Sequence, residues 1–227
     1  MKKIGFIGAY DKTDLILYVA KALVECQKKV LVFDTTITQK TRYVVPSIAP
    51  SKCYVTEYEN FDVAVGFDEL DSVQKYLGMD SLEYDYILID IDDNKYFQKL
   101  DMTNASKNYF VTGFDSYSLK KGLEIIGKMQ DKVLMTKVLF SLEMLQEEDD
   151  YLNFLSFYYA VRWENKKIYF PCDVEDTAAI IENQRVARIR FKNLSETYRD
   201  GLCSFINDMA PDIREGDIRK IIFKRGE

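Results

Sequence analysis

The 227-residue sequence is acidic, with 31 lysines and arginines against 37 aspartates and glutamates and a net charge of −6. This charge argues against bulk nucleic-acid binding. Because histidine is absent, Ser-His-Asp and Cys-His hydrolysis and every histidine-ligated metal site are excluded. No Cys-x-x-Cys pair is present, and scattered cysteines are typical of a reducing cytoplasm; they are Cys26, Cys53, Cys172 and Cys203.

The N-terminal part of the sequence predicts a strand, a helix and a second strand. Residues 2–8 are predicted to form a short buried strand, and residues 13–27 carry apolar side chains at helical spacing. Residues 29–34 are predicted to form a second buried strand that ends on a carboxylate. A strand, a helix and a strand at this spacing predict a βαβ unit with a right-handed crossover.

The alternation of strands and helices continues to the end of the sequence. Its clearest strand is at residues 86–90, because a continuous apolar run predicts burial on both faces of a parallel sheet. Further strands are predicted at residues 53–58, 61–67, 108–112, 132–140 and 167–170, and helices at residues 68–77, 118–129, 149–163, 176–183 and 195–209. We therefore expect a three-layer, doubly wound α/β fold, with helices on both faces of a mostly parallel sheet. We expect one such domain over residues 1–211, followed by a basic tail at residues 212–227.

The segment between the first strand and the first helix lies where α/β folds place a phosphate-binding loop. Such a loop has the pattern G-x-x-x-x-G-K-[ST], in which the lysine contacts the outer phosphates and the hydroxyl holds Mg²⁺. Lys12 and Thr13 match the end of this pattern, and Gly8 remains inside the loop. Asp11 stands where the pattern requires glycine.

These residues and two later strands resemble the MinD/ParA group of P-loop ATPases. The strand that ends at Asp34 is similar to the family strand that carries a catalytic-site aspartate, and the strand that ends at Asp90 looks like its Walker B strand. The resemblance implies a nucleotide site, ATP or ADP with Mg²⁺, formed by Gly8, Asp11, Lys12, Thr13, Asp34 and Asp90. It also implies that Mg²⁺ is held by Thr13, Asp34 and Asp90.

Several departures from the family pattern predict a weakened phosphate site. The Asp11 carboxylate would repel phosphate oxygens, and at about 4 Å this repulsion is roughly 4 kcal/mol at an effective dielectric of 20. The signature lysine of the family falls on Ile7, and Ala9 replaces the next glycine. We therefore assign no catalytic residue. The alternative to a phosphate site is a plain turn, in which Asp11 and Lys12 are solvated or pair with each other.

The acidic run Asp90-Ile91-Asp92-Asp93 allows two interpretations. Three carboxylates together could bind a divalent ion without nucleotide. Alternatively the run is an exposed turn, and strand-end aspartates such as Asp34 and Asp90 cap the loop or helix that follows them.

The C-terminal run from Ile218 to Arg225 holds four basic residues and no acidic one. As a helix it would place Ile218, Ile221 and Ile222 together with bases beside them. The resemblance to MinD-like proteins implies reversible peripheral docking of such a tail on an anionic membrane. The run also fits an edge strand, because Ile-Ile-Phe has high β propensity.

Three functions follow from these patterns. We favour a non-catalytic or weakly active, cytoplasmic adapter or localisation protein of a bacterial membrane-associated assembly, such as a pilus or secretion apparatus. The resemblance to CpaE-like pilus proteins with weakened loops implies this role, and residues 35–58 would supply a surface for a protein partner or a homodimer. The alternative is an active ATPase that binds Mg-ATP through Lys12 and Thr13 and switches dimerisation or membrane docking. A small-molecule enzyme on a Rossmann-like sheet is disfavoured, because no G-x-G-x-x-G follows the first strand.

Overall fold

The computed structural model describes residues 1–47, 51–130, 132–142 and 146–224. Its strands are β1 (Lys2–Ile7), β2 (Val30–Asp34), β3 (Tyr54–Tyr58), β4 (Phe61–Val65), β5 (Tyr86–Ile91), β6 (Lys107–Thr112), β7 (Val133–Ser141) and β8 (Val161–Pro171). Its α-helices are α1 (Thr13–Glu25), α2 (Thr41–Val44), α3 (Leu70–Leu77), α4 (Asn94–Lys99), α5 (Ser116–Gly127), α6 (Gln146–Leu155), α7 (Val174–Arg185), α8 (Glu196–Met209) and α9 (Glu215–Ile222).

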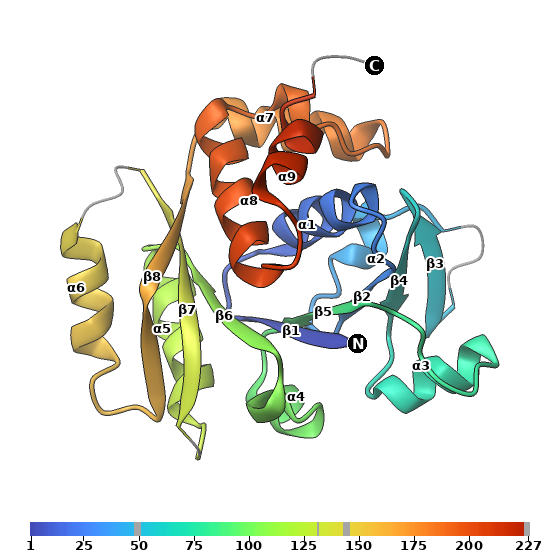
Figure 1. Cartoon of the computed structure of the whole chain (residues 1–227). Helices are drawn as coiled ribbons and strands as arrows, with labels where there is room; N and C mark the ends of the chain where they lie inside the picture. The colour runs from blue at the N-terminus through green and yellow to red at the C-terminus, as the bar shows by residue number, and fades with distance from the viewer. Residues whose placement is uncertain (48–50, 131, 143–145, 225–227) are drawn as a thin grey trace.

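One eight-stranded sheet runs through the molecule in the order β3-β4-β2-β5-β1-β6-β7-β8 (Figure 1). All neighbouring strands are parallel except β3 and β4, which form an antiparallel pair at one edge. Every residue of β2 and β5 is buried, as the continuous apolar runs predict for the centre of a parallel sheet. The predicted mostly parallel sheet is confirmed.

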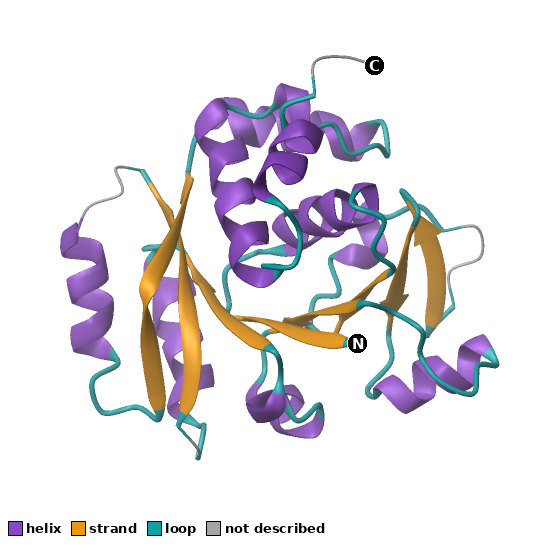
Figure 2. Ribbon diagram, viewed as in Figure 1, coloured by secondary structure: helices purple, strands orange, loops and turns teal. Residues whose placement is uncertain are grey.

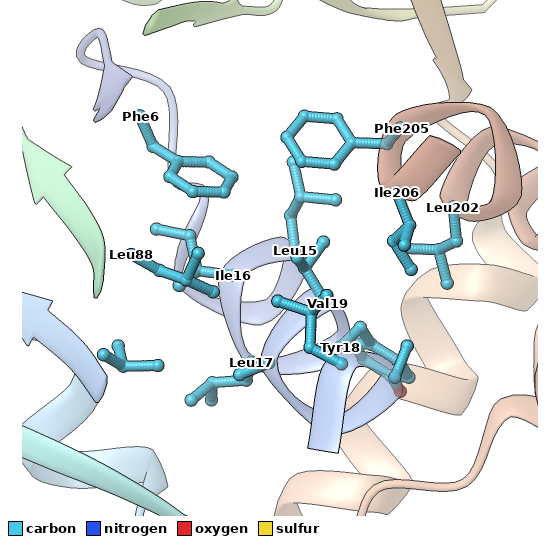
Figure 3. Packing of buried hydrophobic residues seen from close by; sticks show 14 of the residues in the cluster. Phe6, Leu15, Ile16, Leu17, Tyr18, Val19, Leu88, Leu202, Phe205 and Ile206 are labelled. Atoms are coloured by element: carbon cyan, nitrogen blue, oxygen red, sulfur yellow. The ribbon is translucent and has the colours of Figure 1, made fainter. Parts of the chain in front are cut away.

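Helices cover both faces of the sheet (Figure 2). One apolar cluster joins the sheet to α1, α7, α8 and α9, and a second cluster joins it to α3, α4, α5 and α6. Figure 3 shows part of the first cluster, in which apolar side chains of α1 and α8 lie side by side next to Phe6 and Leu88 of the sheet, and the Phe205 ring of α8 stacks on Phe6 at 5.4 Å. This packing fixes where α1 begins, and its N-terminus therefore meets the carboxyl ends of the central strands.

The helix predicted over residues 149–163 is wrong in its second half. Helix α6 ends at Leu155, and Trp163 lies in β8. The Trp163 ring packs 5.5 Å from the Phe110 ring, and its Nε1–H donates to Ser156 at 2.9 Å. The sequence prediction failed because the aromatic residues between α6 and β8 are apolar enough to continue a helix or to begin a strand.

The C-terminal run is helical, so the edge-strand alternative is wrong. Ile218 and Ile222 are fully buried, and α9 packs against α8 and α1. Two of the three apolar side chains that the sequence assigned to a membrane surface, Ile218 and Ile222, therefore lie in the protein core, whereas Ile221 is half-buried. Arg225 falls outside the described residues. Among the described residues, no helix has the length and apolar character needed to cross a membrane.

Candidate functional site

The candidate site lies at the carboxyl ends of β1, β2 and β5. These neighbouring parallel strands end at the same edge of the sheet, and Asp34 is directly in register with Asp90. The structure thus brings the predicted site residues together. Four of them, Asp11, Lys12, Thr13 and Asp90, border a cavity of about 410 Å³. The other residues that line this cavity are Ala9, Tyr10, Thr36, Ile37, Thr38, Lys40, Tyr43, Asp92, Tyr117 and Lys121.

Lys12 is buried and fully engaged with neighbouring groups. Its Nζ lies 2.7 Å from a carboxylate oxygen of Asp90 and donates to the Gly8 carbonyl at 2.8 Å. The alternative in which Lys12 is solvated or paired with Asp11 is therefore wrong. Gly8 has φ +142°, and a Cβ there would lie 2.2 Å from the carbonyl oxygen of Val111, so glycine is required by the neighbouring strand itself.

Asp90 is the most perturbed carboxyl group at the site. Burial raises its pKa to about 7, because the charged form is poorly solvated there, and Asp34 adds repulsion while Lys12 favours the charged form. The Lys12 ammonium is therefore the partner that holds this carboxylate in the interior. Any ligand that attracts Lys12 away from Asp90 leaves a buried carboxylate behind.

Asp11 is exposed and is held by the loop that follows β2. Its carboxylate accepts a hydrogen bond from the Thr13 amide at 3.2 Å and lies 2.5 Å from Lys40 Nζ. Lys40 also reaches Asp14 at 3.0 Å. Lys40 was not among the predicted site residues, because it follows an irregular segment in which no spacing indicates a contact with the first loop.

Asp34 is fully buried and uses both carboxylate oxygens internally. It accepts from the amide and hydroxyl of Thr36 at 2.9 and 2.6 Å, from the Thr41 amide at 3.2 Å and from the Thr41 hydroxyl. These bonds fix the loop of residues 35–41, as the capping interpretation predicts. Thr13, the third predicted Mg²⁺ ligand, is the first residue of α1 and is buried.

Comparison with solved structures finds several proteins of the same overall fold. A ParA family ATPase from Chlorobium tepidum TLS superposes with a TM-score of 0.58 at 14% identity, over 88% of this chain and 97% of its own. MinD of Aquifex aeolicus, in a MinC:MinD complex, matches with a TM-score of 0.58 at 12% identity, over 100% and 98%. A putative plasmid partition protein from Borrelia burgdorferi B31, bound to AMPPNP, matches with a TM-score of 0.56 at 12% identity, over 93% and 98%.

The chain has the fold of the MinD/ParA ATPases. No family model and no curated protein matches the sequence, so the likeness rests on structure. The predicted P-loop NTPase-like α/β fold is thereby confirmed.

The acidic run after β5 of this MinD/ParA fold does not form a joint ion site. Asp92 accepts from the Ile37 amide at 3.1 Å, and Asp93 caps α4 by accepting from the Lys95 amide at 3.0 Å. Among the residues that the structure describes, no group of three histidine, cysteine, aspartate or glutamate side chains could hold a metal ion. The interpretation as a three-carboxylate divalent ion site is wrong, and Asp93 has the capping role.

Three large apolar side chains border the mouth of the cavity in this fold. Ile37, Tyr43 and Tyr117 are 73%, 80% and 69% exposed. Ile37 and Tyr43 fall within the region of residues 35–58 in which the sequence predicts a partner surface. Tyr117 comes from the first turn of α5, and no sequence signal connected it to the other two.

Proposed function

We propose that this chain is a non-hydrolysing adapter built on the MinD/ParA fold, which binds a protein partner over the carboxyl ends of its strands. The observation that carries the proposal is that the charged groups of the nucleotide site are paired with one another. Lys12 is held by Asp90, Asp11 is held by Lys40, and Asp34 is bonded to two threonines. As they stand, these residues do not fit a bound nucleotide.

The energetic reason is the buried Lys12–Asp90 pair. A phosphate that recruits Lys12 must break this pair, and above about pH 7, where the Asp90 carboxyl is ionised, stranding this buried charge costs roughly 3–5 kcal/mol. That cost alone corresponds to a loss of about two to four powers of ten in affinity. The Asp11 carboxylate, exposed at the mouth of the same cavity, adds repulsion that Lys40 offsets only in part.

The partner surface is the apolar mouth of the cavity formed by Ile37, Tyr43 and Tyr117. Exposed aromatic side chains within a polar rim are typical of binding hot spots. The loop that carries Ile37 is fixed by Asp34, so little ordering is needed on binding. MinD of Aquifex aeolicus, which has this fold, forms a complex with the protein MinC. We infer a role in a bacterial membrane-associated assembly, such as a pilus or secretion apparatus.

A second candidate function is a Mg-ATP-dependent switch. The cavity at the start of α1 is lined by Lys12, Lys40 and Lys121, and cations at this place favour anions. Solved proteins of this fold are bound to AMPPNP or ATP. In this reading Lys40 leaves Asp11, Lys12 leaves Asp90, and both contact phosphate oxygens.

Steady-state Mg-ATP turnover distinguishes the two functions. We expect the purified protein to show the same background turnover as Lys12→Ala. Because Lys12→Ala strands Asp90, the double variant Lys12→Met with Asp90→Asn serves as a control that removes both charges and preserves the fold. Turnover that both variants abolish would overturn the adapter proposal in favour of the switch.

A further inference from the structure

A second cavity, which we call the basic groove, lies between α1, α9 and the segment that joins α7 to α8. Its volume is about 310 Å³. Six basic side chains and one acidic side chain line it, although the whole chain carries a net charge of −6. The lining residues are Lys21, Glu25, Arg188, Ile189, Arg190, Phe191, Lys192, Lys220, Ile221 and Lys224.

Most of these bases are available to a ligand. Within the described part of the chain, Arg188, Arg190, Lys192 and Lys224 make no ion pair. Lys21, by contrast, is neutralised by two glutamates of the chain itself. The groove therefore holds unpaired positive charge, which favours an acidic occupant.

The basic groove is also rigid and has an apolar floor. The Arg188 amide donates to the Asn183 carbonyl at 3.0 Å, and the Asn183 side chain donates to the Arg190 carbonyl at 3.0 Å. Ile189 is buried between the two arginines, and the Phe191 ring lies 5.8 Å from the Tyr18 ring. A fixed apolar floor with cations at its rim suits aromatic side chains that carry acidic neighbours.

The chain itself presents such a segment. Tyr151, Phe154, Phe157 and Tyr158, which we call the aromatic ridge, project from α6 and the turn after it, and Tyr158 is 93% exposed. Glu147 and Asp150 are exposed in the first part of α6, beside the ridge. Several large apolar side chains exposed next to one another are typical of an interaction surface.

The ridge and the groove cannot meet within one molecule. Leu152 of α6 belongs to the apolar cluster on one face of the sheet, whereas Ile218 and Ile222 of α9 belong to the cluster on the other face. Figure 1 shows α6 beside β8 at one end of the sheet and α9 over its opposite face. A contact between them must join two copies.

We propose that the aromatic ridge of one copy binds the basic groove of a second copy, so that the chain assembles head to tail. The aromatic rings cover the floor at Ile189 and Phe191, and the exposed Glu147 carboxylate at the start of α6 pairs with a groove arginine. Such a contact is heterologous, because each bound pair leaves one free groove and one free ridge. The inference goes beyond the adapter proposal and does not depend on it.

Sedimentation velocity from micromolar to millimolar protein tests this assembly. At low salt we expect the average mass to rise with protein concentration. At about 1 M salt, where the screening length is about 3 Å, we expect the average mass to fall toward that of the monomer. Arg188→Glu with Arg190→Glu in the groove, or Phe154→Ser with Phe157→Ser in the ridge, should each weaken association by about tenfold or more. Thermal unfolding checks that these exposed substitutions preserve the fold.

The matched controls lie outside both surfaces. Arg185→Glu changes an exposed arginine near the groove, and Tyr43→Ser changes an exposed aromatic side chain at the proposed partner surface. Neither control should alter the assembly. A loss of assembly in Tyr43→Ser would place the contact elsewhere and overturn the proposal.

The decisive measurement is an equimolar mixture of the groove variant and the ridge variant. The first retains its ridge and the second retains its groove, so we expect a dimer with one copy of each and nothing larger. A mixture that stays monomeric would overturn the proposal. So would an unsubstituted protein that is monomeric throughout the range, or an oligomer that both variants leave unchanged.

Discussion

At the scale of single residues, Lys12 is held in the interior by Asp90, in the loop between β1 and α1 where the sequence resembles a phosphate-binding motif. The motif in the sequence was sufficient to place Lys12, Thr13 and Asp90 at one site. It could not show that Lys12 and Asp90 pair, because their distance depends on the register of β1 against β5. Asp11 was recognised as a departure from the motif, whereas its partner Lys40 was not.

The raised pKa of Asp90 predicts a pH-dependent stability. Its folded pKa of about 7 lies above the ordinary 3.8, so between about pH 4 and 7 the folded state binds a proton that the unfolded chain releases. The stability that this group contributes is present below about pH 4 and is lost as the pH rises toward 7. The free energy of unfolding, relative to Asp90→Asn, should fall by up to about 1.4 kcal/mol per pH unit in this window.

Urea denaturation of the wild type and Asp90→Asn at several pH values measures this difference. The variant is the matched control, because it keeps the shape of the side chain and every other titrating group. A difference between the two that is constant from pH 4 to 8 would contradict the assignment.

At the scale of elements, the loop of residues 35–41 is organised by the Asp34 side chain. Asn in place of Asp34 keeps the shape but replaces one acceptor oxygen by a donor that faces the Thr41 amide or the Thr36 amide. We expect Asp34→Asn to lower the free energy of unfolding by about 2 kcal/mol, because buried donors are then left unpaired. Chemical denaturation measures the change, with Asp71→Asn, an exposed aspartate in α3, as control. An unchanged or raised free energy of unfolding would indicate that Asp34 binds a ligand and does not stabilise the fold.

Helix α9 gives a second prediction at this scale. Ile222 is fully buried against the core, whereas Lys220 on the same helix is exposed. Ile222→Ala should therefore cost about 2–5 kcal/mol of unfolding free energy, and Lys220→Ala less than about 0.5 kcal/mol. Equal and small effects in a denaturation experiment would mean that α9 is a detachable tail.

The elements that the sequence predicts best are those with one dominant signal. Strand β5 is a continuous apolar run, and its prediction was confirmed to within one residue. The boundary between α6 and β8 was missed, because the aromatic residues there are compatible with a helix and with a strand. Tertiary contacts, such as that of Trp163 with Phe110, determine which of the two forms. Helix α4 was missed because the acids that precede it were weighed as a turn or an ion site, and Asp93 is its N-cap.

At the scale of the whole molecule, the fold matches MinD/ParA structures while only 12–14% of the residues are identical. The buried central strands and α1 require only apolar side chains at the right spacing, so the architecture could be predicted from pattern. The pairing of charges at the site depends on contacts between segments that are distant in the sequence, and the spacing of apolar residues does not predict such contacts. The molecule thus has the MinD/ParA fold, while the charged side chains at the carboxyl ends of its central strands are paired with groups of the protein itself.

Calorimetric titration of the wild-type protein with Mg-ATP and Mg-ADP tests this account most directly. Lys12→Met with Asp90→Asn, which lacks both charges, serves as the reference for non-specific heat. We predict no saturable binding up to millimolar nucleotide, because Lys12 remains paired with Asp90. Saturable binding by the wild type that the double variant lacks would contradict the account and show that the loop still holds phosphate.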